Sequence, residues 1–362
     1  MKLFKLALCY ILLSPLSSSL AQQLSDEVWG KVVPAMEGAR ILPSGRENPA
    51  FVNPALLASD SLKFNDSVLS LPTAGVTASY KPQDAAIKTT AVGFSVTTSN
   101  KNARMTVFHN TYADAIGVKS IGVNATDIFA LEPSMALKVL EPELTKLDSE
   151  DILAAGAVSD FGVAISFPLS IVNMPISVGV SPKLQRIDTF NYEAVINSFE
   201  PGELDDASYR SEEATFNLDI GVAMEPVEGL VVAMSGQDLI SKELETVESQ
   251  GRTLNYRVDP KFAAGVAYDW NSLTFTTDID LNPIKRFDET VGTQYWRFAG
   301  EVRATDWLAL RLGYRHDMKD NRASVYSLGT GVELGQVFSL DFTGMVSSDD
   351  AIGGVLKTSY HF

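Results

Sequence analysis

The run LTFTTDIDL at residues 273–281 alternates apolar with polar side chains. One face carries Leu273, Phe275, Ile279 and Leu281, and the other carries Thr274, Thr276, Asp278 and Asp280. A period of two is the side-chain period of a β-strand, so this run predicts a strand with one apolar and one polar face.

Similar runs of about ten residues recur along the chain, and that is the length a tilted strand needs to cross the hydrocarbon layer. Strands of soluble β-sandwiches more often have about five or six residues. We therefore predict an all-β fold, a transmembrane antiparallel β-barrel of about fourteen strands, because single-chain bacterial barrels have even strand numbers. The strands are expected near residues 74–81, 88–98, 103–112, 159–168, 174–190, 213–224, 229–238, 259–269, 272–282, 294–304, 307–317, 323–333, 336–347 and 353–362.

The connections between these runs alternate short with long, as they do in barrels with short periplasmic turns and longer external loops. Short turns are expected at 99–102, 169–175, 226–229, 270–271, 305–306 and 334–335. External loops are expected at 113–158, 191–212, 239–258, 283–293 and 318–322. The barrel therefore has a predicted periplasmic end and a predicted cell-surface end.

The first residues predict an export signal. Lys2 and Lys5 precede an apolar run at 6–13. In Ser19-Leu20-Ala21, the first and third residues supply small side chains at the two positions that a signal peptidase recognises. We expect a signal peptide over residues 1–21, and a mature chain that lies in the outer membrane of a Gram-negative cell.

The composition excludes several classes of function for this chain. The formal net charge of −16 becomes −18 without the signal, since 27 basic residues then face 45 acidic ones, and this balance excludes nucleic acid as a partner. The only cysteine, Cys9, lies in the expected signal, so disulfides, thiolate metal sites and cysteine nucleophiles are excluded. No later stretch approaches the roughly 18 apolar residues of a membrane-spanning helix.

The last strand carries a possible assembly signal. Leu356, Thr358, Tyr360 and Phe362 alternate with Lys357, Ser359 and His361. A final strand that ends in Phe362, with Tyr360 two residues before it, resembles the signal read by barrel-assembly machinery. That machinery and outer-membrane lipid are therefore the expected partners.

Residues 22–73 precede the barrel, which is expected over 74–362. They contain Asn48-Pro49 and Asn53-Pro54, each followed by alanine. Asparagine as N-cap and proline at the first helical position predict one short helix. The segment either enters the barrel as a hatch or remains a periplasmic tail with a helical turn, and we favour the hatch.

The long loop 113–158 carries apolar residues at helix-like spacing between about 126 and 156. The ligand-capture candidates among them are Ile128, Leu131, Met135, Val139, Leu140 and Leu144. The predicted helices either pack on each other and cap the mouth, or line an apolar entrance. Capping is favoured, because such stripes usually form a core.

Charged residues on the polar faces of the C-terminal strands are predicted to lie in the lumen. They are Asp278, Asp280, Arg297, Glu301, Arg303, Arg311 and Arg315. They could form a charged constriction or an anchor for the hatch, but a ladder of cross-strand ion pairs is favoured. Asp278 and Asp280 could also hold a cation, although polar lumen lining explains them as well.

No constellation predicts catalysis, because the chain has no GxSxG, HExxH or phosphate-binding glycine loop. His109 and His361 fall in expected strands, and His316 with Asp317 is interpreted as a solvated turn pair. We therefore expect no enzyme activity, no cofactor and no metal.

Four motifs resemble the TraF-like family named after plasmid transfer operons, a group of outer-membrane barrels. They are RENPAFVNPALLA at 46–58, KLQRIDTFNY at 183–192, TDIDLNP at 277–283 and LRLGYRHDMKDN at 310–321. The resemblance spans nearly the whole mature chain and implies an accessory barrel of conjugal transfer or another envelope assembly. The thioredoxin-like TraF proteins do not fit, since the chain has no CxxC.

An NPA segment before a barrel with a helical external loop is also similar to the long-chain fatty-acid transporter (FadL-like) superfamily. Its members have fourteen strands, an internal N-terminal hatch and a hydrophobic capture site in outer loops. This resemblance is architectural. It implies a passive channel for small hydrophobic molecules, with capture at 113–158 and control by 22–73, and we favour it over the accessory role.

Overall fold

The computed structural model describes residues 53–58, 68–70, 74–78, 85–100, 103–119, 152–171, 174–193, 207–249, 253–288, 291–334, 338–348 and 352–361. Nearly all of them lie in strands. The helical elements in these ranges are two 3-10 turns, η3 (Pro54–Ala58) and η7 (Ala207–Tyr209).

One large antiparallel sheet contains 15 of the strands. They are β1 (Val68–Ser70), β2 (Ala74–Ala78), β3 (Ala85–Asn100), β4 (Ala103–Lys119), β5 (Ile152–Ile171), β6 (Met174–Glu193), β7 (Arg210–Val227), β8 (Leu230–Gln237), β11 (Lys261–Trp270), β12 (Leu273–Asp280), β13 (Tyr295–Thr305), β14 (Leu308–Asp317), β15 (Val325–Leu334), β16 (Phe338–Ser347) and β17 (Ile352–His361). The remaining two, β9 (Lys242–Glu245) and β10 (Asn255–Val258), form a separate hairpin.

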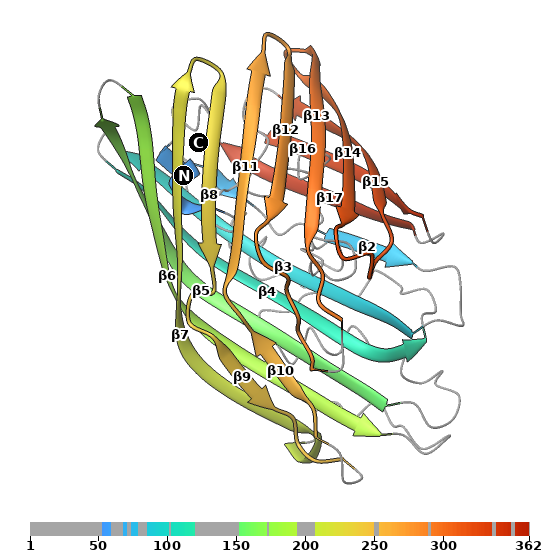
Figure 1. The fold of residues 1–362 in the computed structure, drawn as a ribbon. Helices are drawn as coiled ribbons and strands as arrows, with labels where there is room; N and C mark the ends of the chain where they lie inside the picture. The colour runs from blue at the N-terminus through green and yellow to red at the C-terminus, as the bar shows by residue number, and fades with distance from the viewer. Residues whose placement is uncertain are drawn as a thin grey trace, which may run out of the picture.

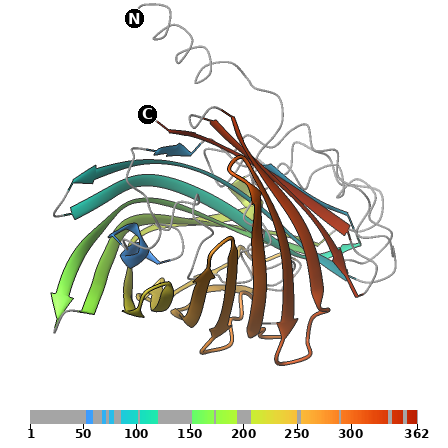
Figure 2. The same ribbon diagram turned by 90° about the horizontal axis from the view of Figure 1, so that it is seen from above.

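The sheet closes on itself into a barrel. From β3 to β17 each wall strand pairs with the next, and β1 pairs with both β3 and β17. β2 also pairs with β17, with Ala74 opposite Leu356. β1 and β2 therefore share one position, so the 15 strands fill fourteen positions of the wall. The strands surround the lumen when the molecule is seen from above (Figure 2).

Short turns lie at one end of the barrel, at the top of Figure 1, and we call this the turn end; the opposite end is the loop end. The six turns predicted from the sequence join β3–β4, β5–β6, β7–β8, β11–β12, β13–β14 and β15–β16. Gly229 and Asn271 adopt positive φ angles of 80° and 57° in two of them, as tight hairpin turns require. The predicted alternation of short and long connections is confirmed.

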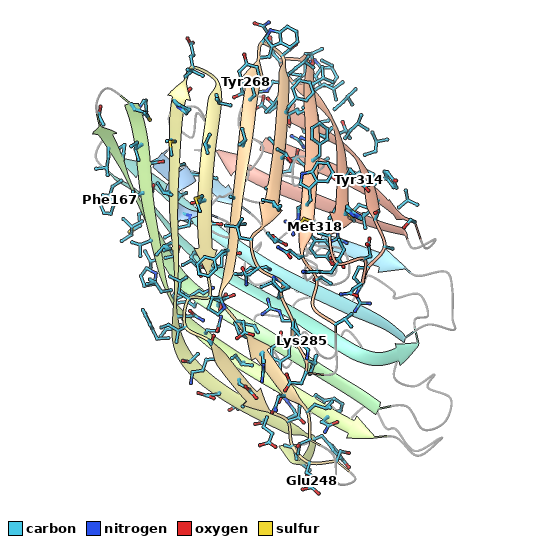
Figure 3. The ribbon with its side chains drawn as sticks, viewed as in Figure 1. Phe167, Glu248, Tyr268, Lys285, Tyr314 and Met318 are labelled. Atoms are coloured by element: carbon cyan, nitrogen blue, oxygen red, sulfur yellow. The ribbon has the colours of Figure 1, made fainter. Side chains whose placement is uncertain are left out.

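The two faces of the wall have the polarity of a membrane barrel. Phe275 and Ile279 of β12 are 41% and 37% exposed, while Thr276 and Asp278 between them are 3% and 2% exposed. A soluble sheet buries its apolar face instead. Figure 3 likewise shows Phe167 of β5 pointing away from the barrel. The apolar face predicted from LTFTTDIDL is therefore the lipid-facing one.

Two predicted boundaries are wrong. The wall already includes β1, although residues 22–73 were expected to precede it. The loop predicted at 113–158 is also shorter, since β4 continues to Lys119 and β5 begins at Ile152. At 152–158 (ILAAGAV) apolar and polar residues hardly alternate. The reason is that apolar side chains also cover the inner face of the wall there, since Val158 packs with Tyr256.

The hairpin β9–β10 was not predicted, because the sequence at 239–258 was interpreted as one external loop. Each of its strands has only four residues. It lies at the loop end beside the long strands β5–β7, which reach well beyond the shorter strands of the C-terminal half (Figure 1).

Candidate functional site in the lumen

The turn η3 fills part of the lumen. Asn53 caps it as predicted: its side-chain Oδ1 accepts a hydrogen bond from the Ala55 amide (3.0 Å), and its carbonyl accepts one from Leu56 (3.1 Å). Residues 53–58, which we call the plug turn, are all buried. The neighbouring candidates Asn48 and Pro49 lie outside the described residues.

The wall beneath the plug turn is built from small residues. Leu56 packs on alanines of β7, β8 and β11, and Leu57 packs on Phe108 and Ala164. Gly179 and Gly221 allow the backbone of the plug turn to come close, because a Cβ atom at Gly179 would lie 2.3 Å from the Ala55 nitrogen. We call this surface the plug recess. Asn53 of the turn and Ser166 of β5 make polar contacts here, and Lys183 of β6 lies beside Phe108 at Gly162.

Two hydrogen bonds tie the plug turn to the wall. The Asn53 Nδ2 group donates to the Met234 carbonyl (3.1 Å), and the Ser166 hydroxyl donates to the Ala55 carbonyl (2.9 Å). Apolar contacts of Leu56 and Leu57 with the wall add to these bonds. Hydrogen bonds and apolar packing together hold this buried segment in place.

The opposite side of the lumen contains the predicted charges. Arg297 of β13 donates to Asp278 (2.9 Å) and, through two nitrogens, to Asp280 (2.9 and 3.1 Å). Arg311 of β14 bonds Glu301 (2.6 Å) and also Asp341 of β16. These six side chains are buried and form a ladder of ion pairs across β12–β16, the arrangement favoured above.

The second pair of Arg311 spans a whole strand. Gly331 of β15 lies between the Arg311 and Asp341 side chains, and a Cβ atom there would come within 2.5 Å of the Asp341 carboxylate. Glycine thus leaves room for an ion pair between strands that are not neighbours.

The other two predicted lumen arginines behave differently. Arg315 is buried, with its guanidinium 4.4 Å from the centre of the Tyr295 ring. Arg303 lies close to the turn end with a side chain 62% exposed, 3.4 Å from Glu301, so it is not a buried lumen residue. The cause is its position beside the β13–β14 turn, at the end of the wall where the inner face meets solvent.

Asp317 is not a solvated turn residue. It is fully buried, and its carboxylate accepts backbone hydrogen bonds from Gln294, Lys319, Asn321 and Arg322. His316 is partly exposed and stacks on Tyr314. Asp317 thus shapes the β14–β15 loop, where the His316 ring lies 3.3 Å from the Ser324 hydroxyl.

A buried cluster on β5–β8 was missed by the sequence analysis. The Lys183 Nζ atom lies 3.0 Å from Asp160, 3.1 Å from Asp219 and 2.7 Å from Asp238. Gln185 bridges Asp160 and Asp238. These residues, the Lys183 cluster, lie on the loop side of the plug recess. The inward-facing polar positions were visible in the sequence, but their convergence depends on the strand register.

The Lys183 cluster fixes the point where the chain leaves β8. Asp238 has a positive φ of 52°, and its amide donates to Asp219 (2.7 Å). Burial favours the neutral form of the Asp238 carboxyl, but the charges of Lys183 and Arg286 outweigh it and hold its pKa below the ordinary value. Lys183 thus stabilises the ionised Asp238 carboxylate in this turn.

The six capture candidates between Ile128 and Leu144 lie outside the described residues, and so does Phe362. Tyr360 lies in β17 opposite Phe338. In the described ranges, no group of three or more His, Cys, Asp or Glu side chains is arranged to hold a metal ion.

None of the helical elements in the part of the chain that the structure describes is long and apolar enough to cross a membrane.

Comparison with known proteins identifies both a family and a fold. The family described as "F plasmid transfer operon, TraF, protein" matches residues 82–280. No curated protein gives a significant match. The Ralstonia pickettii toluene transporter TbuX is similar in structure, with a TM-score of 0.61, 9% identity, and coverage of 91% of this chain and 98% of TbuX.

Two further solved structures share the architecture. The CymD monoaromatic hydrocarbon channel has a TM-score of 0.56 at 10% identity, with 96% of this chain and 98% of CymD covered. A Pseudomonas aeruginosa FadL homologue has a TM-score of 0.51 at 12% identity, with 96% and 99% covered. The chain therefore has the fold of the FadL-like outer-membrane β-barrels.

Proposed function

The chain belongs to the F plasmid transfer operon TraF protein family, and we propose that it is an outer-membrane channel through which small apolar molecules diffuse passively. The observation that carries this proposal is the plug turn, whose leucine side chains are buried against apolar residues of the lumen wall. A channel of this kind needs no catalytic group, and we propose that the protein is not an enzyme.

The chemistry of the plug recess favours an apolar ligand. Leu56 and Leu57 are withdrawn from water by alanine, valine and phenylalanine side chains. An apolar molecule that replaced them would find the same surroundings, whereas a charged molecule would lose its hydration without gaining a partner. The recess therefore selects against charge.

The ion-pair ladder of the C-terminal half supports the same role. Its charges satisfy one another across β12–β16, so they fill that side of the lumen with fixed, mutually bonded groups. Passage is then left to the side of the plug turn. Orientation follows the general rule for such barrels, with the turn end in the periplasm and the loop end at the cell surface.

We propose that residues 126–156, with Ile128, Leu131, Met135, Val139, Leu140 and Leu144, capture the ligand outside the cell. Deleting 126–156 should abolish uptake and leave a folded barrel, recognisable by its heat-dependent shift on gel electrophoresis. Unchanged uptake would refute the capture role.

The direct test of the channel is uptake of radiolabelled toluene by intact Gram-negative cells. Cells that make the full chain should accumulate toluene faster than cells with an empty vector, and benzoate, which has a ring of the same size but a charge, should show no such gain. Equal toluene uptake in the two strains would contradict the proposal.

Family membership supports a second candidate, an accessory barrel of an envelope assembly such as a conjugal transfer apparatus. Cross-linking in intact cells distinguishes the two. A stoichiometric protein partner would favour the accessory barrel, and an apolar molecule co-purifying with a solitary barrel would favour the channel.

A further inference from the structure

Ser181 of β6 lies on the inner face of the wall, at the loop-side edge of the plug recess. It is two residues from Gly179, which the plug turn approaches closely, and two residues from Lys183. Its side chain is fully buried, and its hydroxyl has no hydrogen-bond partner among the described residues. Such a group is rare in folded proteins, because it has lost its bonds to water and gained none in return.

The neighbours of Ser181 across the sheet do not supply the missing bond. By the register of β5 with β6, Ala164 lies opposite Ser181, and alanine has no polar side-chain group. On the other side Asp219 of β7 lies opposite Ser181. Its carboxylate is already bonded to the Lys183 Nζ atom (3.1 Å) and the Asp238 amide (2.7 Å). The Ser181 hydroxyl is therefore available to a group that enters the lumen.

The same position adjoins the apolar surface that holds Leu57 of the plug turn. Leu57 packs on Phe108 and Ala164. The Cβ atoms of cross-strand neighbours such as Ala164 and Ser181 lie about 5 Å apart. A ring in the place of Leu57 would therefore bring one substituent within reach of the Ser181 hydroxyl.

The charges beside Ser181 decide which substituent fits. Three carboxylates, those of Asp160, Asp219 and Asp238, lie within 3.1 Å of the Lys183 Nζ atom. An anionic substituent would be repelled by these carboxylates and would find the lysine occupied. A methyl group would leave the Ser181 hydroxyl buried without a bond. A neutral hydroxyl both donates and accepts a hydrogen bond, so it satisfies the serine in either orientation.

We propose that Ser181 is the specificity-determining residue of the plug recess, and that it selects phenols, which are uncharged rings with a hydroxyl group, over hydrocarbons of the same shape. The ring takes the place of Leu57 when the plug turn moves out, and its hydroxyl bonds to Ser181. This inference rests on the proposed channel function and names a substrate class for it.

Uptake of phenol and toluene by the same cells tests the role of Ser181, because the two rings differ only by a hydroxyl in place of a methyl group. Ser181→Ala should lower the initial rate of phenol uptake about 2- to 10-fold, the range of one neutral hydrogen bond, and leave toluene uptake unchanged. Thr343→Val is the matched control. It removes another fully buried hydroxyl that has no hydrogen-bond partner among the described residues, on the ladder side of the lumen, and should leave both rates unchanged.

The possible outcomes separate this role from the channel itself. Equal phenol uptake by the wild type and Ser181→Ala, with toluene uptake intact, overturns the role of Ser181 and leaves the channel standing. An equal loss of phenol uptake in Thr343→Val, or an equal loss of both rings in Ser181→Ala, also overturns it. Absence of uptake of either ring above cells with an empty vector refutes the channel and the role of Ser181 together.

Unfolding of the purified barrel in urea tests the same contact without transport. Phenol should raise the unfolding midpoint of the wild type more than that of Ser181→Ala, because a ligand of the folded state stabilises it to a degree that grows with affinity. Without phenol, the midpoint of Ser181→Ala should be no lower than that of the wild type, since the substitution breaks no side-chain hydrogen bond among the described residues. Equal shifts with phenol would overturn the contact.

Discussion

The lumen changes character between β11 and β12. Ala263, Gly265 and Ala267 of β11 lie directly opposite Asp280, Asp278 and Thr276 of β12. On the β11 side the turn-end half of the lumen is small and apolar and holds the plug turn, and on the β12 side it is filled by ion pairs. One wall thus combines an apolar recess that holds a segment of the chain with a side that is cross-linked by ion pairs.

The two sides differ in what holds them. The plug turn is held by burial of apolar side chains and by hydrogen bonds such as Asn53–Met234 and Ser166–Ala55, whereas each carboxylate of the ladder is bonded to a buried arginine. Removing one partner of a buried ion pair leaves an uncompensated charge, while removing an apolar side chain costs only its own contacts. Substitutions in the ladder are therefore predicted to lower the stability of the barrel, and substitutions in the plug turn are predicted to change the rate of uptake.

The largest effect is expected from Arg297→Met. It leaves Asp278 and Asp280 buried without their arginine, which costs about 3 to 5 kcal/mol of stability. The midpoint of urea unfolding in detergent should fall clearly, while the rate of toluene uptake by the surviving folded barrel should stay unchanged. An unaltered midpoint would mean that the ladder is not what fixes this side.

Leu56→Ala should affect the plug turn and leave the ion-pair ladder unchanged. Truncation of a buried leucine costs about 2 to 5 kcal/mol where the site cannot collapse. Here that cost loosens the plug turn rather than the wall, so toluene uptake should rise with an unchanged unfolding midpoint. Loss of barrel stability instead would show that the turn is part of the wall's core.

Asn53→Ala should give a smaller change in the same direction. It removes the cap of η3 and the bond to the Met234 carbonyl, a loss of about 1 kcal/mol. Uptake should exceed that of the wild type but remain below that of Leu56→Ala. The order of the three uptake rates is the measurement, and a reversed order would contradict the account.

Arg303→Ala should have the smallest effect. This arginine is mostly exposed and lies at the rim of the ladder, so its loss should change stability by no more than about 0.5 kcal/mol. A midpoint shift as large as that of Arg297→Met would remove the distinction between rim and ladder.

The features that the sequence predicted are those that a local pattern determines. Strands such as 273–281 were predictable because the membrane and the lumen impose opposite polarity on alternate residues. The ladder followed from these strands, since the inward positions of adjacent strands carried opposite charges. Even the cap of the plug turn could be read from Asn53 and Pro54.

What the sequence did not predict depends on contacts between distant segments. The Lys183 cluster needs β5, β6, β7 and the end of β8 in register, and no local pattern marks Lys183 as the meeting point. The β9–β10 hairpin has strands of four residues, too short for alternation to appear. Gly179 and Gly221 indicate close approach only when the segment that approaches is known.

We propose that the plug turn lies in the path of the ligand, and the uptake rate of the Gly221→Ala variant tests this role. A Cβ atom at this position would lie 1.8 Å from the Asn53 side-chain oxygen, whereas one at Gly344 meets nothing within 4 Å. Gly344→Ala is therefore the matched control. The account predicts faster toluene uptake for Gly221→Ala and wild-type uptake for Gly344→Ala, with both barrels folded. Equal uptake by the two folded variants would contradict it.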